Sequence, residues 1–220
     1  MDSLSRDLRG LVAGYLEVKE QCVLIEECEW SEQCLVPCAK YVELHLGEYT
    51  PDTMKCVLEN MGGKVDPSAN DNWAIRFASL RGSAEVIRLL LADPRVDPGA
   101  YDNFAIQWAS RYGYTEIVGM LLTDPRVDPS ANNNRALLYA VEYGYSRVVE
   151  ILLADPRVGP IVGDNCAIRL ASRYGHTEIV GMLLADPRVD PGANNNQAMQ
   201  WASENGHTEV VRLLKQATPT

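Results

Sequence analysis

The sequence lacks the features of a membrane-spanning protein, of a secreted protein and of the common enzyme classes. No apolar run approaches the roughly 18–20 residues of a membrane-spanning helix, and the start of the chain does not resemble a signal peptide. The sequence has no Gly-rich phosphate loop, no nucleophile motif and no His-Glu-x-x-His pair. We therefore expect a cytoplasmic, non-enzymatic protein that binds no cofactor, no metal and no membrane.

Basic residues are too few for a typical nucleic-acid-binding protein. The chain has 20 Lys and Arg against 30 Asp and Glu, a formal net charge of −10, and residues 1–66 alone hold 13 acids and 6 bases. Acidic surfaces repel phosphate backbones, so we expect no nucleic-acid partner. Another protein is the expected partner.

Cysteine is nearly absent after residue 56, since five of the six cysteines precede residue 57. Nothing in the sequence indicates an oxidising compartment, so we expect reduced thiols rather than disulfides. Cys34 and Cys38 have the spacing of a zinc ligand pair, and Cys22, Cys28 and His45 are near them in the sequence. Buried reduced thiols remain the favoured interpretation over a zinc site.

What the chain has in abundance is one repeated segment of 31 residues. Asn falls at 72, 103, 134, 165 and 196, a mid-unit Gly at 82, 113, 144, 175 and 206, and Asp-Pro-Arg-Val begins at 93, 124, 155 and 186. A fixed period of roughly 20 to 50 residues is the signature of a repeat array, in which each unit buries its apolar face against its neighbours.

The residues of one unit predict two short helices and a loop. After Asn103, the pattern Ala-Ile-x-x-Ala places three apolar residues on one helix face, and Gly113 is suited to end that helix in a left-handed conformation. The Asp124-Pro125 pair ends the second helix. We expect the repeated Asn to cap the first helix, and Thr115, Ser146, Thr177 and Thr208 to cap the second.

This plan resembles the ankyrin repeat. Residues 105–118 read Ala-Ile-Gln-Trp-Ala-Ser-Arg-Tyr-Gly-Tyr-Thr-Glu-Ile-Val. They align with the family's pattern, which is Thr-Pro-Leu-His-x-Ala-Ala-x-x-Gly-His-x-Glu-Val-Val. The resemblance covers residues 72–217. The family's first His is replaced by Arg76, Gln107, Leu138, Arg169 and Gln200, whereas His176 and His207 stand at the turn position, where they are expected to be structural and to bond local backbone.

The resemblance implies an all-α ankyrin-repeat solenoid of helix-turn-helix units with short extended loops, whose concave face binds another protein. The units are 41–71, which is degenerate, and 72–102, 103–133, 134–164, 165–195 and 196–217. The short Asp-Pro-Arg-Val-Asp-Pro repeat is similar to arrays common in amoebal and giant-virus proteins, which implies the host cytoplasm if the protein is viral.

Residues 1–40 lie outside the repeat and have two interpretations. Their apolar residues at helical spacing predict short helices that cap the apolar end of the array. Alternatively, Leu4 to Leu16 is similar to the first helix of an F-box, Leu-Pro-x-Asp/Glu-Leu-x-x-x-Ile-Leu-x-Tyr-Leu. That resemblance implies a substrate adaptor that brings a target protein to a cullin-based ubiquitin ligase and docks the ligase linker subunit through Leu4, Leu8, Leu11, Tyr15 and Leu16.

Binding residues are sought where the copies differ, because positions needed for stacking should repeat. Positions 73, 77 and 81 and their equivalents share one face of the first helix. We expect the middle position mostly to pack between units, and the last one, just before the Gly, to be exposed for recognition, since Trp, Tyr and Arg dominate interface energetics. The predicted partner-binding residues are Trp73, Arg81, Phe104, Trp108, Tyr112, Arg135, Tyr139, Tyr143, Tyr174 and Trp201.

Two further features have structural explanations beside functional ones. Arg95, Arg126, Arg157 and Arg188 repeat in register and could bind phosphate, but each is flanked by Asp, which favours a structural Asp–Arg lattice. The unit 134–164 departs most among the clear copies, with Gly159-Pro160-Ile161-Val162-Gly163 in its loop. This apolar loop is either a contact point or sequence drift.

Overall fold

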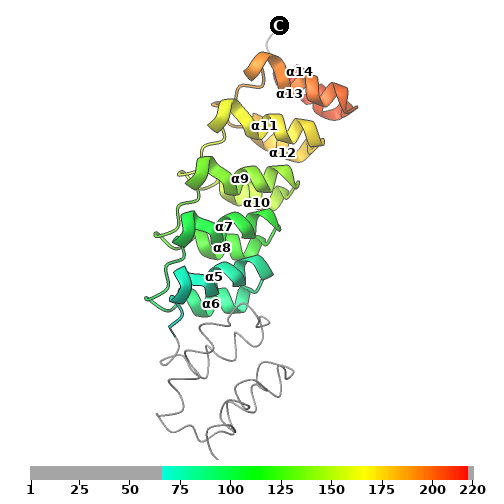
Figure 1. Ribbon diagram of the computed structural model, residues 1–220. Coiled ribbons are helices and arrows are strands. Elements are labelled where there is room, and N and C mark those ends of the chain that lie inside the picture. The colour runs from blue at the N-terminus through cyan, green and yellow to red at the C-terminus, as the bar shows by residue number, and fades with distance from the viewer. Residues whose placement is uncertain (1–65, 218–220) are drawn as a thin grey trace, which may run out of the picture. The chain divides into compact units, whose positions relative to one another are not determined.

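The computed structural model describes residues 66–217, which contain ten helices and no strand (Figure 1). They fall into two compact parts, residues 66–100 and residues 101–217. The first part holds α5 (Ala69–Arg81) and α6 (Ala84–Leu91). The predicted all-α repeat architecture is confirmed, because the helix pair recurs with the 31-residue period of the sequence.

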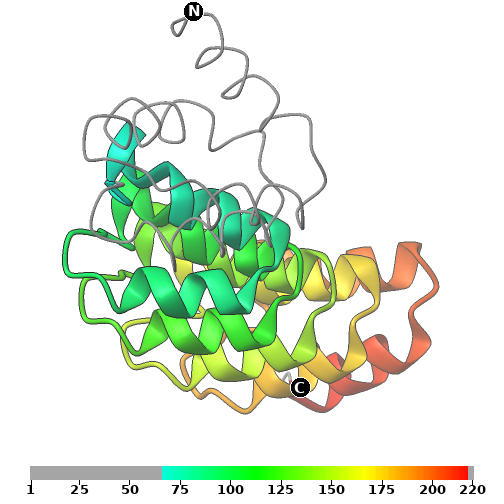
Figure 2. The ribbon, with the colours of Figure 1, turned by 90° about the horizontal axis from the view of Figure 1, so that it is seen from below.

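The second part, residues 101–217, is a stack of four helix pairs (Figures 1 and 2). The first helices α9, α11 and α13 pack side by side, and the second helices α8, α10, α12 and α14 do the same. The loops that follow α8, α10 and α12 lie along one edge of this stack, on the left in both views. The helices are α7 (Ala100–Arg111), α8 (Thr115–Leu122), α9 (Ala131–Glu142), α10 (Ser146–Leu153), α11 (Val162–Tyr174), α12 (Thr177–Leu184), α13 (Ala193–Glu204) and α14 (Thr208–Ala217).

The core of the stack is built from the apolar positions that repeat. In α7 and α8, Ile106, Ile117 and Leu121 are at most 1% exposed, and their equivalents in the later units are buried in the same way, except for the half-buried Met199 in the last unit. Burying an Ile or Leu side chain contributes roughly 1.5–3 kcal/mol relative to leaving it in water. No helix within residues 66–217 is long and apolar enough to cross a membrane.

Each first helix begins with a left-handed turn of three residues. In α9, Asn132, Asn133 and Asn134 have φ of 53°, 59° and 57°, and the residues at these positions in the other units also have positive φ. Asn, Asp and Gly supply this conformation at the lowest cost, because an ordinary L-residue loses roughly 1–2 kcal/mol there. Tyr101, with φ 57°, is the exception in α7.

The repeated Asn does not act as the expected cap of the first helix. Asn103 Oδ1 accepts a hydrogen bond from the backbone N–H of Asp128 at 2.7 Å, and Asn134 Oδ1 accepts one from Gly159 N–H at 3.2 Å. The same bond recurs at 72 to 97 and at 165 to 190. A capping Asn has extended φ/ψ, whereas the left-handed φ here directs the amide to the loop 25 residues later.

The expected cap of the second helix is also shifted by one residue. Thr115 is the first residue of α8, and the preceding Tyr114 is the N-cap, with no side-chain cap hydrogen bond. The turn is closed by backbone bonds, such as Thr115 N–H to the Gly113 carbonyl at 2.9 Å. The left-handed Gly predicted at this turn is confirmed, with φ of 73° at Gly113 and 78° at Gly144.

An aromatic or imidazole ring of the next unit covers each of these Gly residues. A Cβ on Gly144 would lie 2.6 Å from the His176 ring, and a Cβ on Gly113 would lie 2.6 Å from the Tyr145 ring. His176 Nε2 also lies 3.2 Å from the carbonyl oxygen of Glu142. The turn His is therefore structural, but its backbone partner belongs to the preceding unit rather than to its own turn.

Residues 1–65 lie outside the part of the chain that the structure describes. The predicted N-terminal cap or F-box-like region, its docking residues, the cysteine cluster and all but the last six residues of the degenerate unit 41–71 fall there.

Candidate functional site

Aromatic side chains follow one another along the first helices of residues 101–217. The ring of Trp108 stacks on Phe104, with centroids 5.2 Å apart, and on Tyr112 at 5.9 Å. It also lies 6.5 Å from the ring of Tyr139 in the next unit. The i, i+4 spacing within α7 and the stacking of α9 beside it bring these rings together. We call the surface formed by Phe104, Trp108, Tyr112, Arg135, Tyr139, Tyr143, Tyr174 and Trp201 the first-helix face.

Arg111 lies among these rings and was not identified from the sequence. Its guanidinium carbon is 5.0 Å from the ring centroid of Trp108, 5.1 Å from that of Tyr139 and 5.4 Å from that of Tyr143. Arg135 covers the Tyr139 ring as well, at 4.8 Å. A cation over an aromatic face contributes roughly 0.5–1 kcal/mol at an exposed site. Desolvation opposes the charge of Arg111, but the nearby Tyr143 and Tyr139 outweigh it and raise its pKa above the ordinary value.

A second cluster of the same kind lies two units further along. Arg173 stands 62 residues after Arg111, at the same position of its unit. Its guanidinium carbon lies 5.6 Å from the ring centroid of Tyr174 and 5.3 Å from that of Trp201 in the next unit. The sequence does contain a signal that could have identified these two arginines. At this position of the unit the residues are Arg111, Glu142, Arg173 and Glu204, so the sign of the charge alternates from unit to unit.

The tyrosines just before the Gly turn are exposed, as expected for that position. Tyr112 is 43% exposed, Tyr143 44% and Tyr174 43%, so three neighbouring units present one large ring each. The middle position is more enclosed, because Trp108, Tyr139 and Trp201 are half-buried. The structure therefore separates a packing row from an exposed row on the same helices.

The remaining predicted binding residues lie in the other part of the chain, on or beside α5. Trp73 stacks on Phe77 with ring centroids 4.4 Å apart. The guanidinium carbon of the exposed Arg81 lies over the Phe77 ring, 5.1 Å from its centroid. The same combination of stacked rings and an arginine thus occurs in residues 66–100.

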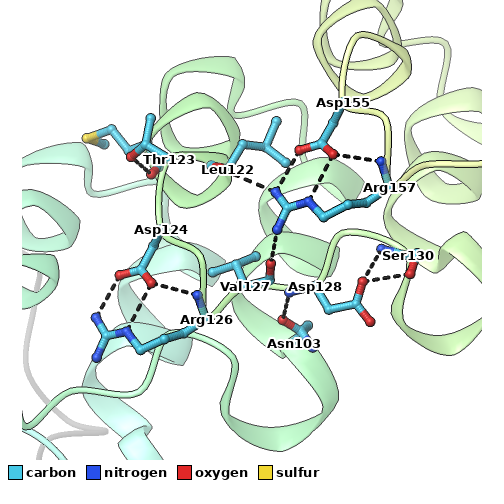
Figure 3. A network of polar contacts seen from close by, with 11 residues as sticks. Asn103, Leu122, Thr123, Asp124, Arg126, Val127, Asp128, Ser130, Asp155 and Arg157 are labelled. Atoms are coloured by element: carbon cyan, nitrogen blue, oxygen red, sulfur yellow. Dashed lines mark hydrogen bonds and ion pairs between the residues drawn. The ribbon is translucent and has the colours of Figure 1, made fainter.

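The repeated loop arginines are paired with aspartates (Figure 3). Arg126 donates from Nη2 to Asp124 Oδ2 at 2.6 Å, and from Nε and its backbone N–H to Oδ1 at 2.9 Å. These bonds hold the pKa of Asp124 below its usual value, the Arg126 side chain being the largest cause. The Arg188 side chain similarly lowers the pKa of Asp186 to about 2. Carboxylates already occupy these guanidinium groups, which favours the structural interpretation over phosphate binding.

One loop arginine also joins neighbouring units. Arg157 Nη1 donates to the carbonyl of Val127 at 2.7 Å, and Nη2 donates to that of Leu122 at 3.4 Å (Figure 3). Asp155 holds the same guanidinium at 2.6 Å. The Asp–Arg pair therefore positions a side chain that ties the loop of one unit to the loop of the unit before it.

Most of the residues that replace the family's first His donate hydrogen bonds to backbone carbonyls of the left-handed turns. Gln107 Nε2 donates to the carbonyl of Asp102 at 2.6 Å, and Gln200 Nε2 donates to that of Asn195 at 2.9 Å. Arg76 and Arg169 reach the equivalent turns in their units. The exception is Leu138, which has no donor. These positions are structural and do not add to the first-helix face.

Among residues 66–217, no group of three or more His, Cys, Asp or Glu side chains is arranged to hold a metal ion. The geometry that the described residues do offer is a stack of helix pairs with exposed rings and guanidinium groups on one set of helices. This is the architecture of a helical repeat protein with a binding surface.

Comparison with known families agrees with this architecture. The family model of ankyrin repeats, which spans three copies, matches residues 73–164 and, in a second overlapping match, residues 137–219. The chain belongs to the ankyrin-repeat family. A search of the curated proteins finds no match to the sequence. Ankyrin repeats are generally non-enzymatic modules that bind other proteins.

Proposed function

We propose that the protein is a non-enzymatic scaffold that binds a partner protein on the first-helix face. The observation that carries this proposal is the row of Tyr112, Tyr143 and Tyr174, each 43–44% exposed on adjacent units. A buried core does not need them at this position, because the middle residues Trp108 and Tyr139 already fill the contact between units. Tyr, Trp and Arg are the residues that most often carry binding energy in interfaces.

The experiment that tests this proposal compares two faces of the same molecule. The full chain with Tyr112, Tyr143 and Tyr174 replaced by Ala is compared with a chain in which Glu116, Arg147 and Glu178, exposed on the second helices, are replaced by Ala. Proteins captured from a cell extract are quantified for each variant, and thermal unfolding confirms that both variants fold. We expect the tyrosine variant to lose captured partners that the second-helix variant keeps. Equal capture by both variants would contradict the proposal.

The adaptor function is a second candidate, supported by the F-box-like pattern of Leu4, Leu8, Leu11, Tyr15 and Leu16. In this version the N-terminal region docks the linker subunit of a cullin-based ubiquitin ligase, and the first-helix face selects the target. Replacing Leu8 and Leu11 by Glu should abolish capture of the linker subunit and leave target capture intact. A wild-type chain that does not bind the purified linker would rule out this version.

The cellular setting is part of the proposal. We place the protein in the cytoplasm, and in the host cytoplasm if its similarity to amoebal and giant-virus arrays reflects a viral origin. Fractionation of cells that express the full chain, with an antibody against it, would locate the protein. Recovery from a membrane or nuclear fraction would contradict this placement.

A further inference from the structure

The two arginine–aromatic clusters of residues 101–217 are built alike. The first consists of Arg111 with Trp108, Tyr139 and Tyr143, and the second of Arg173 with Tyr174 and Trp201. In each, the arginine contacts a ring of its own first helix and a ring of the next unit. Packing between units does not require an arginine at this position, because the intervening unit has Glu142 there.

The first helices of residues 101–217 hold more bases than acids only in their right-handed segments, because the left-handed turns before these segments add Asp102 and Asp164. Their right-handed segments, 104–112, 135–143, 166–174 and 197–205, hold four Arg and two Glu. Residues 101–217 as a whole hold ten bases and thirteen acids. Three of these four arginines, Arg111, Arg135 and Arg173, lie over aromatic rings of the first helices, in a part of the chain that is acidic as a whole. Complementary charge steers association and discriminates between partners.

We propose that the first-helix face binds an extended acidic segment of the partner, with one carboxylate at Arg111 and another at Arg173. This inference rests on the proposed scaffold function and names the chemistry of its partner. A guanidinium that lies on an aromatic face still has N–H groups along its edge, which suit bidentate contact with a carboxylate. Its contacts with the rings also restrict it before binding, so less side-chain entropy is lost.

The spacing of the two clusters sets the spacing of the carboxylates. Packed helices lie about 8–10 Å apart, so positions two units apart are separated by about 16–20 Å. An extended chain advances about 3.3–3.6 Å per residue, which places the two acidic residues about five or six positions apart. Acidic stretches repel themselves and stay extended. Glu142 on the intervening helix α9 disfavours a third acid at the middle of the segment, where the Tyr143 ring offers an apolar contact.

The test uses the full chain and labelled peptides of about twelve residues, a length that spans both clusters. The acidic peptide has a pair of Glu near each end, placed to match the predicted spacing, with Ser and Pro between them. In the two control peptides, Gln or Lys replaces each Glu. Fluorescence anisotropy measures binding. We expect the acidic peptide to bind, binding to weaken as salt is added, and the Gln and Lys peptides to bind at least about tenfold more weakly.

Two double variants locate the binding site. R111Q with R173Q removes the arginine of each arginine–aromatic cluster, whereas R147Q with R212Q removes the same charge from α10 and α14, where these side chains are 69% and 52% exposed. The affinity of the first double variant for the acidic peptide should be lower than that of the wild type by about tenfold or more. The affinity of the second double variant should be nearly unchanged. Equal loss in both variants would overturn the proposal, because it would show only a general effect of charge.

Other occupants give other results. An oligothymidylate of similar length that binds more tightly than the acidic peptide would indicate a nucleic acid and overturn the proposal. Self-association of the chain in sedimentation experiments, lost in the R111Q/R173Q variant, would identify a second copy as the occupant and also overturn it.

The outcome also separates this inference from the scaffold function. If the tyrosine variant loses a captured partner but R111Q/R173Q keeps it, the scaffold function stands, and the proposal that the partner binds through an acidic segment is wrong. If neither variant loses the partner, the scaffold function itself is wrong.

Discussion

The unit 103–133 and the unit 134–164 have the same helices but satisfy their polar groups differently. In the first, Gln107 donates to the left-handed turn and Asp128 Oδ1 accepts from Ser130 N–H at 2.9 Å in the loop. In the second, Leu138 stands at the place of Gln107 and Gly159 at that of Asp128. Both units keep the left-handed turn, the Gly turn and the Asn bond to the loop. The backbone plan therefore depends on the features that the two units share.

The difference between the loops also concerns binding. Ile161, in the loop of the second unit, is 44% exposed, whereas the residue at the equivalent place in the first unit is the polar Ser130. The apolar side chain lies at the surface, as the contact interpretation of this loop requires.

The largest predicted effect comes from breaking a shared feature. Gly144→Ala is expected to cost roughly 2–5 kcal/mol of unfolding free energy, because the new Cβ is strained by the positive φ and would lie 2.6 Å from the His176 ring. Gly206→Ala is the control, since it has φ +75° but nothing within 4 Å of the added Cβ. It should cost only about 1–2 kcal/mol in urea denaturation. Equal losses would show that the ring contact does not matter.

The second prediction concerns the Asn bond that both units keep. Asn134→Ala should cost about 2 kcal/mol or more, because the Gly159 N–H loses its acceptor at a site where Asn134 is 4% exposed. Asn133→Ala provides the matched control, since Asn133 has nearly the same φ but an exposed side chain. Hydrogen exchange of the Gly159 amide should accelerate only in the first variant. Unchanged protection would argue against the bond.

The third prediction exchanges the residues that distinguish the two units. Gln107→Leu should cost about 1 kcal/mol, because the Asp102 carbonyl loses its donor. Leu138→Gln should change stability by less than about 0.5 kcal/mol, since a new hydrogen bond is offset by lost apolar contact of the half-buried Leu138. Thermal unfolding of both variants measures the asymmetry. Equal and opposite shifts would show that the donor alone distinguishes the units.

The smallest prediction is a gain in stability. Gly119 in α8 has nothing within 4 Å of an added Cβ, and the second unit has Glu150 at the same helix position. Gly119→Ala should raise the unfolding free energy by roughly 0.5–1 kcal/mol through helix propensity. Gly181→Ala in α12 should do the same, and a loss of stability in either variant would contradict the prediction. Calorimetry of each variant beside the wild type measures the shift.

The sequence was enough to predict the features that repeat every 31 residues. The helix pairs, the left-handed Gly turn and the exposed Tyr before it follow from local chemistry within one unit. Local chemistry misled us at Asn103, because its partner lies 25 residues later and its own φ is left-handed. Arg111 could not be assigned from its own helix, since two of its three rings belong to the next unit.

The bonds that hold the stack together have a short reach along the chain. The Asn bond joins residues 25 apart, and the bond of His176 to the carbonyl of Glu142 joins residues 34 apart. Closing loops of this size costs little entropy and is typical of chains that fold quickly. Such contacts also give way locally under tension. A chain pulled from its ends should lengthen in steps of about 100 Å, as each 31-residue unit unravels while the units further away stay folded.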